Sequence, residues 1–394
     1  MSKLLLSLFL VLLFSQLWAQ SYDFSKVPGT VVNHEPASNK RFLGSPSICI
    51  LPDGNYIVSH DYFGPESNCK TQAQTFVFES KNQGKSWEKI ASVNQFWGGL
   101  FYHKNALYIM GCDNEKGNLI IRRSTDGGHS WTEPTNQENG LIRAADVEKG
   151  FHTSAVPVVV ANGRIWRAME VCRKNGSWGG FEAFVLSASI DSDLMNASNW
   201  TTTNRIAVDP SWNEDFKTWL EGNVVLAPGN KIVNIMRADT RIAEKAAILS
   251  VNEAGTTLTF NPTTDLIDFP GGCKKFVVRF DEESGKYWTL SDEADSKYTD
   301  TKIERRRNKL VLMSSADLRN WEIRSVILFD EDVEKSGFQY VDWLFENNDI
   351  VMACRTAFFD GVSKADNQHN SNFITFHRIK DFRKRNLTDP RLNK

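Results

Sequence analysis

The sequence predicts an all-β protein, a six-bladed β-propeller built from four-stranded antiparallel blades. Three observations lead to this prediction: an apolar hairpin that recurs six times, a repeated turn motif that ends in tryptophan, and a composition rich in glycine and aromatic residues. The 394-residue chain contains 25 Gly, 25 Phe and 12 Trp. Such a composition is typical of many short strands joined by tight turns.

Each predicted hairpin has two β-rich runs on either side of a turn that contains Gly, Asn or Asp. The six segments are residues 45–61, 98–112, 154–170, 220–237, 274–290 and 338–355. They recur about every 60 residues, which fits four-stranded blades with variable loops. Their near-continuous apolar runs favour the two inner strands of a blade, which are buried on both faces.

The sixth blade differs from the others because no clear turn motif follows its hairpin. Its third strand is predicted at residues 372–379. We expect the segment before Pro46 to close the ring against this blade, since an unpaired sheet edge would otherwise remain.

The turn motif is clearest in STDGGHSW, residues 124–131, and in SKNQGKSW, residues 80–87. Looser copies occur at 250–258, at 314–321 and before Trp200. The Asp or Asn caps the turn, the Gly supplies a positive φ, and the Trp packs back into the blade. We therefore interpret Asp126 and Asn82 as structural residues, and we expect Trp87, Trp131 and Trp321 to be buried in blade cores.

The first 19 residues have the basic, apolar and small-residue regions of a secretory signal peptide. This predicts a secreted or periplasmic protein whose residues 20–394 form a single domain, with no later segment apolar enough to span a membrane. The net charge is −2 and the pI is about 6.4, which argues against a general nucleic-acid binder.

The six cysteines are widely scattered and form no CxxC pair. They would permit up to three disulfides, but their spacing argues against a zinc site. We expect no metal and no cofactor.

Polar residues gather at the positions that a propeller brings together around one end of its axis, the natural ligand site of this fold. These are the starts of the innermost strands and the ends of the second strands. The residues at or near these positions are His60, Asp61, Tyr62, Trp97, Asp113, His152, Glu170, Glu221, Arg237, Asp239, Lys275, Arg307, Tyr340, Asp342, Arg355, His369 and Asn372.

So many charges beside apolar strands are costly unless they are paired or meet a ligand. One interpretation is a network of ion pairs that closes the pore. The other is a site for transfer at the anomeric centre of an anionic sugar, which needs an acid, a nucleophile or base, and cations.

The order of these residues resembles that of the sialidase (neuraminidase) superfamily over essentially all of the mature chain. The resemblance implies that Asp61, after the hairpin GSPSICILPDGNYIVSHD, is the acid/base, and that Glu221 in WLEGNVV polarises the nucleophile Tyr340 in GFQYVDW. It also implies that Arg237 and Arg307 bind the substrate carboxylate. The repeated turns resemble the Asp-boxes of these propellers, which lie on the face away from the active site.

One departure concerns the first arginine of the sialidase pattern, where this chain has Gly44. Only Arg41, three residues upstream, could replace it. This predicts a relative adapted to a different acidic or neutral glycan, such as one that bears a uronic acid. The further substrate-binding residues that we predict are His60, Lys275, Asp342, Arg355 and His369.

Three functions are compatible with these observations. The first is a secreted, sialidase-like glycoside hydrolase that acts on an oligo- or polysaccharide. The second is a polysaccharide lyase on a uronic-acid glycan, in which His60 or His369 acts with Tyr340 in proton abstraction while Arg237 and Arg307 neutralise the carboxylate. The third is a propeller that binds a glycan or a protein without catalysis.

Overall fold

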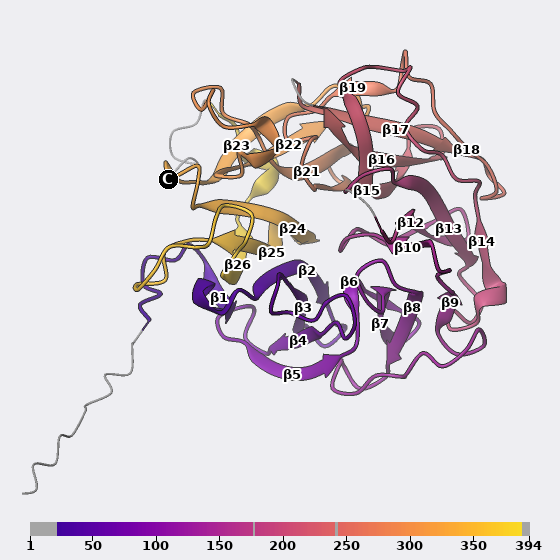
Figure 1. Cartoon of the computed structure of the whole chain (residues 1–394), viewed down its shortest axis with the longest axis horizontal. Helices are drawn as coiled ribbons and strands as arrows, with labels where there is room; N and C mark the ends of the chain where they lie inside the picture. Colours follow the sequence, from indigo (N-terminus) through magenta and orange to yellow (C-terminus); the bar gives the residue numbers. More distant parts are fainter. Residues whose placement is uncertain (1–21, 176–177, 241–242, 388–394) are drawn as a thin grey trace, which may run out of the picture.

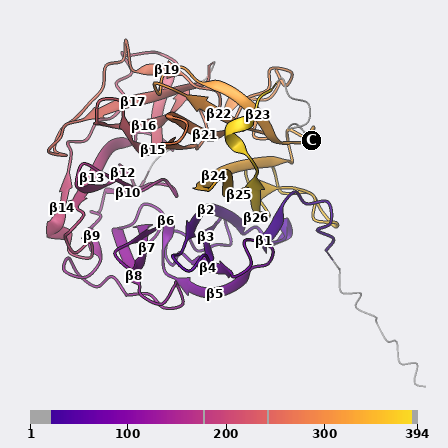
Figure 2. The same ribbon diagram turned by 180° about the vertical axis from the view of Figure 1, so that it is seen from behind.

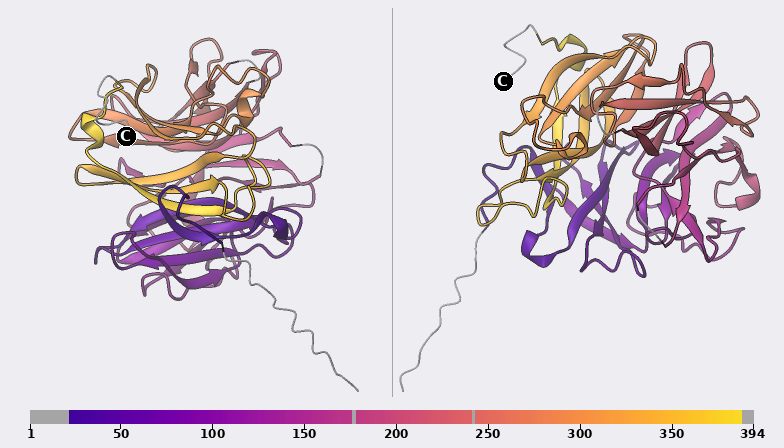
Figure 3. Two further views of the ribbon diagram at one scale, coloured as in Figure 1. Left: turned by 90° about the vertical axis from the view of Figure 1, so that its left-hand side faces the viewer. Right: turned by 45° about the horizontal axis from the view of Figure 1, so that its top comes forward.

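The computed structural model describes residues 22–175, 178–240 and 243–387. Six antiparallel sheets are arranged as blades around a central axis (Figures 1 and 2), which confirms the predicted six-bladed β-propeller. The views in Figure 3 show the twist of the individual sheets. The predicted signal peptide, residues 1–19, lies outside the described residues.

Blades 1 to 3 follow one another along the chain, and all three of the predicted hairpins in this half are present. In blade 3 the position of the innermost strand is divided between two short strands that both pair with β12. The strands are β2 (Phe42–Ile50), β3 (Tyr56–Phe63), β4 (Thr75–Ser80) and β5 (Glu88–Val93); β6 (Phe96–His103), β7 (Ala106–Cys112), β8 (Leu119–Ser124) and β9 (Leu141–Arg143); and β10 (Lys149–His152), β11 (Val159–Ala161), β12 (Arg164–Arg173), β13 (Glu182–Ser189) and β14 (Trp200–Thr202).

Blades 4 to 6 contain the other three predicted hairpins. In blade 4 the outermost position is divided between two strands that both pair with β17. The strands are β15 (Phe216–Ala227), β16 (Lys231–Thr240), β17 (Lys245–Val251), β18 (Leu258–Thr259) and β19 (Leu266–Asp268); β20 (Val277–Asp281), β21 (Lys286–Asp292), β22 (Lys309–Ser315) and β23 (Glu322–Phe329); and β24 (Gly337–Glu346), β25 (Asp349–Ala357), β26 (Phe373–Ile379) and β1 (Thr30–His34).

The ring is closed by pairing of the two ends of the chain. β1 lies antiparallel to β26 and forms the fourth strand of blade 6, as both face-on views show (Figures 1 and 2). The expectation that an N-terminal segment closes the ring is therefore confirmed. The only helices among the described residues are short 3-10 turns, η1 (Ala37–Asn39), η2 (Ala197–Asn199), η3 (Ile303–Arg305) and η4 (Phe382–Lys384), and none is long and apolar enough to cross a membrane.

The repeated turns make the hydrogen bonds expected of their sequence. Asp126 Oδ1 accepts from the hydroxyl of Ser124 at 2.8 Å and from the amide of Ser130 at 2.9 Å, and the Gly128 amide donates to Ser124 Oγ at 2.8 Å. The equivalent contacts of Asn82 recur in the turn at 80–87. Asp126 does not line the central cavity described below, in agreement with a structural role.

The tryptophans that end these turns are less buried than expected. Trp87, Trp131 and Trp321 are each only partly buried, although each packs against an apolar core. The reason is visible in two of the turns, where the indole N–H donates to a carbonyl of the turn itself: Trp131 to Gly128 at 2.8 Å and Trp321 to Leu318 at 3.0 Å. These bonds hold the rings at the edge of the blade core.

The apolar core lies between neighbouring blades. One cluster joins β12 and β13 of blade 3 to β15 and β16 of blade 4, and it contains the fully buried Trp166 and Trp219. The indole of Trp219 also donates to the Phe181 carbonyl at 3.1 Å. All six cysteines are buried free thiols, so none of the disulfides that the sequence would permit is formed.

Candidate active site

A cavity of about 680 Å³ opens at one end of the propeller axis, and side chains from all six blades line it. Seven of the ten predicted site residues take part. They are Asp61, Glu221, Arg237, Arg307, Tyr340, Arg355 and His369.

A bulge in the innermost strand places one residue of the cavity wall in each of four blades. In β2, β6, β15 and β24, two consecutive residues face a single residue of the next strand. The first of the two always has a positive φ and lines the cavity: Ser45 (39°), Trp97 (54°), Glu221 (58°) and Tyr340 (54°). A left-handed backbone is costly for such side chains and is held by the surrounding fold, as is common at functional sites.

The second strands of blades 1, 4 and 6 contribute the next layer of the wall. Asp61, Arg237 and Arg355 occupy equivalent places, since each lies opposite the residue that directly precedes a bulge. The repeated hairpin geometry thus brings an acid from blade 1 and two arginines from blades 4 and 6 to one end of the axis.

Glu221 lies between a cation and a tyrosine. Arg237 Nη1 donates to Glu221 Oε2 at 3.0 Å, and the side chain of Tyr340 lies near enough for each group to shift the pKa of the other. Burial alone would raise the pKa of Glu221, but the charges of Arg237 and His152, the hydrogen bond from Arg237 and the hydroxyl of Tyr340 lower it below its usual value. Glu221 is therefore ionised. Burial and the negative charge of Glu221 raise the pKa of Tyr340, which keeps its proton.

Asp61 differs from Glu221 because its pKa is raised and not lowered. It is 2% exposed, and burial raises its pKa from 3.8 to about 7. Its Oδ2 accepts the backbone N–H of Trp97 at 2.7 Å, whereas Oδ1 has no hydrogen-bond partner. A buried, unpaired carboxyl oxygen at a cavity wall is costly unless a ligand completes its contacts.

Three arginines line the part of the cavity formed by blades 4 to 6. Arg307 Nη1 donates to Gln339 Oε1 at 2.7 Å, and Arg355 donates to the carbonyl of His369. The Nε atoms of both Arg237 and Arg355 are buried without a partner. Burial lowers the pKa of Arg355 to about 10 and, together with the positive charge of Arg355, lowers that of His369 well below its usual value.

Three predicted site residues point elsewhere. His60 is fully buried behind the wall, where its ring nitrogens contact the side chain of Asn33 at 3.0 Å and the carbonyl of Asp61 at 3.1 Å. Because side chains alternate along a strand, His60 faces away from the cavity that Asp61 lines. Burial lowers the pKa of His60 to about 4.

Lys275 supports the bulge of blade 6 and does not line the cavity. Its Nζ, in a side chain that is 2% exposed, donates to the Val341 carbonyl at 2.7 Å and to the Tyr340 carbonyl at 3.5 Å. Burial lowers its pKa to about 8. The lysine therefore holds the backbone that presents Tyr340.

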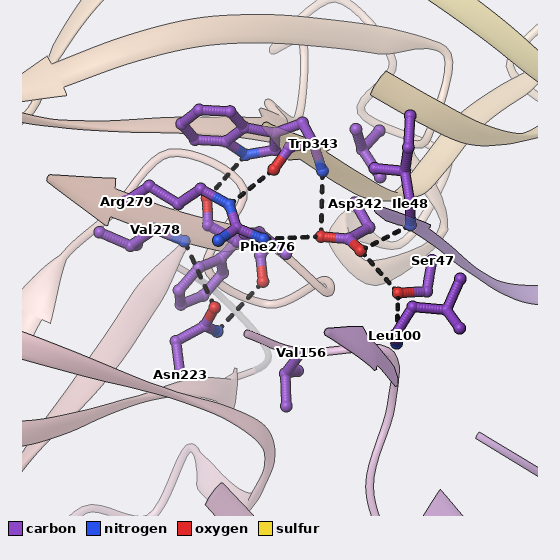
Figure 4. A network of polar contacts seen from close by, with 12 residues as sticks. Ser47, Ile48, Leu100, Val156, Asn223, Phe276, Val278, Arg279, Asp342 and Trp343 are labelled. Atoms are coloured by element: carbon purple, nitrogen blue, oxygen red, sulfur yellow. Dashed lines mark hydrogen bonds and ion pairs between the residues drawn. The ribbon is translucent and has the colours of Figure 1, made fainter. Parts of the chain in front are cut away.

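Asp342 joins blades inside the ring (Figure 4). Its Oδ2 accepts from the hydroxyl of Ser47 at 2.8 Å and the amide of Ile48 at 3.0 Å, and Oδ1 accepts from the Trp343 amide and from Arg279. These contacts satisfy both carboxylate oxygens. The structure thus gives Asp342 a structural position in place of the predicted contact with substrate.

Arg41 also lies outside the cavity wall. Its Nη2 donates to both carboxylate oxygens of Glu35 at 3.0 Å, and its guanidinium lies 4.6 Å from the centre of the Tyr62 ring. A side chain at position 44 would meet Asp61, because a Cβ added to Gly44 would lie 2.5 Å from Asp61 Oδ1. Arg355 is thus the third arginine of the cavity.

The structure adds cavity residues to which the sequence did not assign a role in the site. Trp97 and His152 are among the residues that the sequence placed around one end of the propeller axis. Trp178 comes from the loop after β12, where a glycine-rich stretch around a tryptophan is the only sequence signal that could have indicated it. His152 Nδ1 is hydrogen-bonded to Glu170 Oε2 at 2.8 Å. Among the described residues, no group of three or more His, Cys, Asp or Glu side chains could hold a metal ion.

No family model matches the chain, and no curated protein matches its sequence. Solved structures do match its fold. A protein of unknown function from Dyadobacter fermentans has a TM-score of 0.57 at 15% identity, over 89% of this chain and 97% of its own. A Hadza microbial sialidase has a TM-score of 0.60 at 14% identity, over 89% of this chain and 68% of its own.

A third match is the α-L-arabinanase of Penicillium chrysogenum, solved with arabinobiose. Its TM-score is 0.56 at 13% identity, over 91% of this chain and 98% of its own. At these identities the likeness shows a common fold, which the chain shares with both a sialidase and an arabinanase.

Proposed function

We propose that this protein is an exported glycoside hydrolase that cleaves an acidic glycan in the cavity at the propeller axis. The observation that carries the proposal is the placement of Tyr340 and the buried Glu221 in one cavity wall, on equivalent bulges of two innermost strands, where burial and the charge of Glu221 raise the pKa of the phenol. Asp61 completes the set, because its pKa of about 7 keeps it protonated in mildly acidic solution, as a general acid requires.

In the proposed mechanism Tyr340 attacks the anomeric carbon while Glu221 accepts the phenolic proton. Asp61 gives a proton to the leaving oxygen. In the second step Asp61 takes a proton from the water that attacks the anomeric carbon, and Glu221 returns its proton to the Tyr340 oxygen as the sugar is released. A neutral nucleophile suits an acidic sugar, since a carboxylate nucleophile would repel the negative charge of the substrate.

The arginines support an anionic substrate. Arg237, Arg307 and Arg355 are each less than a tenth exposed and line the same part of the cavity. Two of them have an Nε without a partner. A carboxylate on the sugar could accept charge-assisted hydrogen bonds from the guanidinium groups that line the cavity, worth roughly 1.5–3 kcal/mol each.

The substitution at position 44 favours a sugar other than sialic acid. Neither Gly44 nor the outward Arg41 supplies the first arginine of the sialidase pattern, and the third arginine of this cavity comes from a different blade. We therefore propose a uronic-acid glycan as the substrate and expect poor release of sialic acid.

A panel of sialylated and uronic-acid oligosaccharides, incubated with the purified protein, tests the proposal. We expect mass spectrometry to show a hydrolysed acidic sugar and Tyr340→Phe to abolish its release, with the exposed Tyr102→Phe as the control. Binding of panel members without any turnover would contradict the proposal and would favour a glycan-binding protein.

A polysaccharide lyase is the second candidate, because His369 lines the cavity beside Arg355. In this reaction the base removes the proton next to the substrate carboxylate, and an unsaturated sugar results. An ultraviolet-absorbing product from the same panel would favour the lyase over the hydrolase. The buried His60 could not act as its base.

Export is a separate part of the proposal and rests on residues 1–19. N-terminal sequencing of protein recovered from outside the cytoplasm should find a mature chain that begins near residue 20. A chain that keeps Met1 in the cell would contradict it.

A further inference from the structure

The cavity has two chemically different parts. The three arginines belong to blades 4, 5 and 6, whereas Trp97, His152 and Trp178 belong to blades 2 and 3. Apart from Asp61 and His152, the titratable residues that line the blade 1 to 3 part are Cys69, Lys70 and Glu115, and the two charged ones among these are of opposite sign. Negative charge on a ligand is therefore favoured in only one part of the cavity.

The rings of the second part form a continuous aromatic wall. The ring centres of Trp97 and His152 are 4.4 Å apart, and those of His152 and Trp178 are 5.3 Å apart. Trp178 is 54% exposed although its ring packs on Phe181 at 5.0 Å. A large exposed indole at the mouth of a polar cavity offers an apolar face to a ligand.

His152 adds a polar group to this wall. Glu170 holds its Nδ1 at 2.8 Å, and Glu170 Oε1 in turn accepts the amide of Gly222, next to Glu221. The imidazole is thereby fixed in orientation. Its other nitrogen, Nε2, makes no hydrogen bond to the residues that the structure describes and is free to contact a hydroxyl group of a ligand.

Asp61, the proposed general acid, is hydrogen-bonded to a residue of this aromatic wall. The backbone N–H of Trp97 donates to Asp61 Oδ2 at 2.7 Å, so Asp61 lies directly beside the aromatic residues. A general acid must reach the oxygen of the leaving group. A leaving sugar on the Trp97 side of Asp61 would be within reach of this proton, and the ring that bears the carboxylate would then lie towards the arginines.

We propose that Trp97, His152 and Trp178 form the subsite for the leaving group, and that this group is an uncharged pyranose stacked by its C–H face on the indole rings. The proposal rests on the proposed function for the direction of cleavage, but the subsite is a binding site that can be tested alone. The glycan that the protein cleaves is accordingly mixed, with an acidic sugar linked to a neutral one.

The first experiment measures binding without catalysis. Lactose, cellobiose and xylobiose serve as neutral probes of the full chain in saturation-transfer NMR, and each titration gives a Kd. We expect at least one probe to bind, Trp178→Ala to weaken it about tenfold, and Trp178→Phe to restore most of the affinity. Phe280→Ala removes another exposed ring, away from the cavity, and should leave the Kd unchanged.

Because Trp178 is largely exposed, its replacement should leave folding intact, which an unchanged Tm verifies. No binding of any probe, or equal binding to wild type and Trp178→Ala, would overturn the subsite whether or not the protein hydrolyses a glycan. A complete lack of hydrolysis with probe binding that depends on Trp178 would instead contradict only the proposed function.

The second experiment uses the substrate that the panel identifies together with the glycosyl fluoride of its acidic sugar, whose leaving group has no ring. Trp178→Ala should lower kcat/KM for the oligosaccharide about tenfold and leave that for the fluoride within twofold. An equal loss on both substrates would place Trp178 at the acidic sugar and overturn the assignment.

Discussion

The guanidinium of Arg355 lies over the ring of Tyr340, with its carbon 4.6 Å from the ring centre. The same guanidinium lies 4.3 Å from the centre of the Phe63 ring. Arg355 therefore joins blade 6 to the neighbouring blade 1 at the cavity wall and places a positive charge beside the proposed nucleophile. Such a cation favours the charge that the phenol oxygen carries as its proton moves to Glu221.

Tyr340→Phe should lower kcat by about 10³-fold or more, because it removes the hydroxyl and keeps the ring against Arg355. The Tm should change little. Steady-state kinetics on the identified substrate measures the effect, and mass spectrometry of wild type trapped with a fluorinated glycosyl fluoride should find the sugar on Tyr340. A label on another residue would remove Tyr340 from the nucleophile position.

Arg355→Met should weaken binding of the acidic substrate by about tenfold to a hundredfold, since one charge-assisted contact is lost while the side chain keeps similar length. The matched change Arg324→Met on β23, outside the cavity, should have no such effect. Kinetics on an acidic glycan and on its carboxyl-reduced form measure the difference. Equal losses on both forms would show that Arg355 does not recognise the carboxylate.

The pH dependence of activity should report Asp61. Because its pKa is about 7, kcat/KM should fall above this pH as the acid loses its proton. A substrate with a leaving group that needs no protonation, such as fluoride, should not show this alkaline limb. If kcat/KM of Asp61→Asn still fell above pH 7 as in the wild type, the fall would belong to the titration of another group.

Asp61 should also affect stability in a defined direction. The native state keeps the proton up to about pH 7, whereas an unfolded aspartic acid loses it near 3.8. The free energy of unfolding of wild type should therefore fall, relative to Asp61→Asn, as the pH rises through this window, by up to about 4 kcal/mol. Urea unfolding at pH 4 and pH 8 measures the difference, and an equal difference at both values would contradict the raised pKa.

Gly44→Ala should impair both activity and folding. The new Cβ would lie 2.5 Å from Asp61 Oδ1 and 3.0 Å from Phe63, so the acid must move. We expect kcat/KM to fall at least about tenfold, because catalysis depends on the position of the acid. Gly54→Ala, in an open turn with nothing within 4 Å, is the control and should cost only about 1 kcal/mol of backbone strain.

Asp126→Ala should lower the free energy of unfolding by about 1–2 kcal/mol and leave kcat unchanged, because it removes the acceptor of the turn 124–131 far from the cavity. Burial opposes the shift, but the hydrogen bonds of Ser130 and Ser124 lower the pKa of Asp126 to about 2. Its contribution is thus present above pH 4 and lost as the pH falls towards 2. A loss of kcat in folded protein would contradict the structural role.

The hairpins and turns could be predicted from the sequence because each depends on residues that are close along the chain. The turn of Ser124, Asp126 and Gly128 makes its hydrogen bonds within five residues, so its sequence specifies its geometry. The alternation of apolar residues likewise marks the inner strands. The number of blades and the pairing of the chain ends follow from counting these units.

Only the tertiary structure decided which polar residues face the cavity. His60 and Asp61 are adjacent in β3, yet one is buried behind the wall and the other lines the cavity. The bulge at Tyr340 shifts the alternation in β24, so that Asp342 turns to Ser47 of blade 1. Arg355 and Trp178 likewise reach the cavity from blades far apart in the chain. Strand register, bulges and contacts between blades set these directions, and all of them depend on residues distant in sequence.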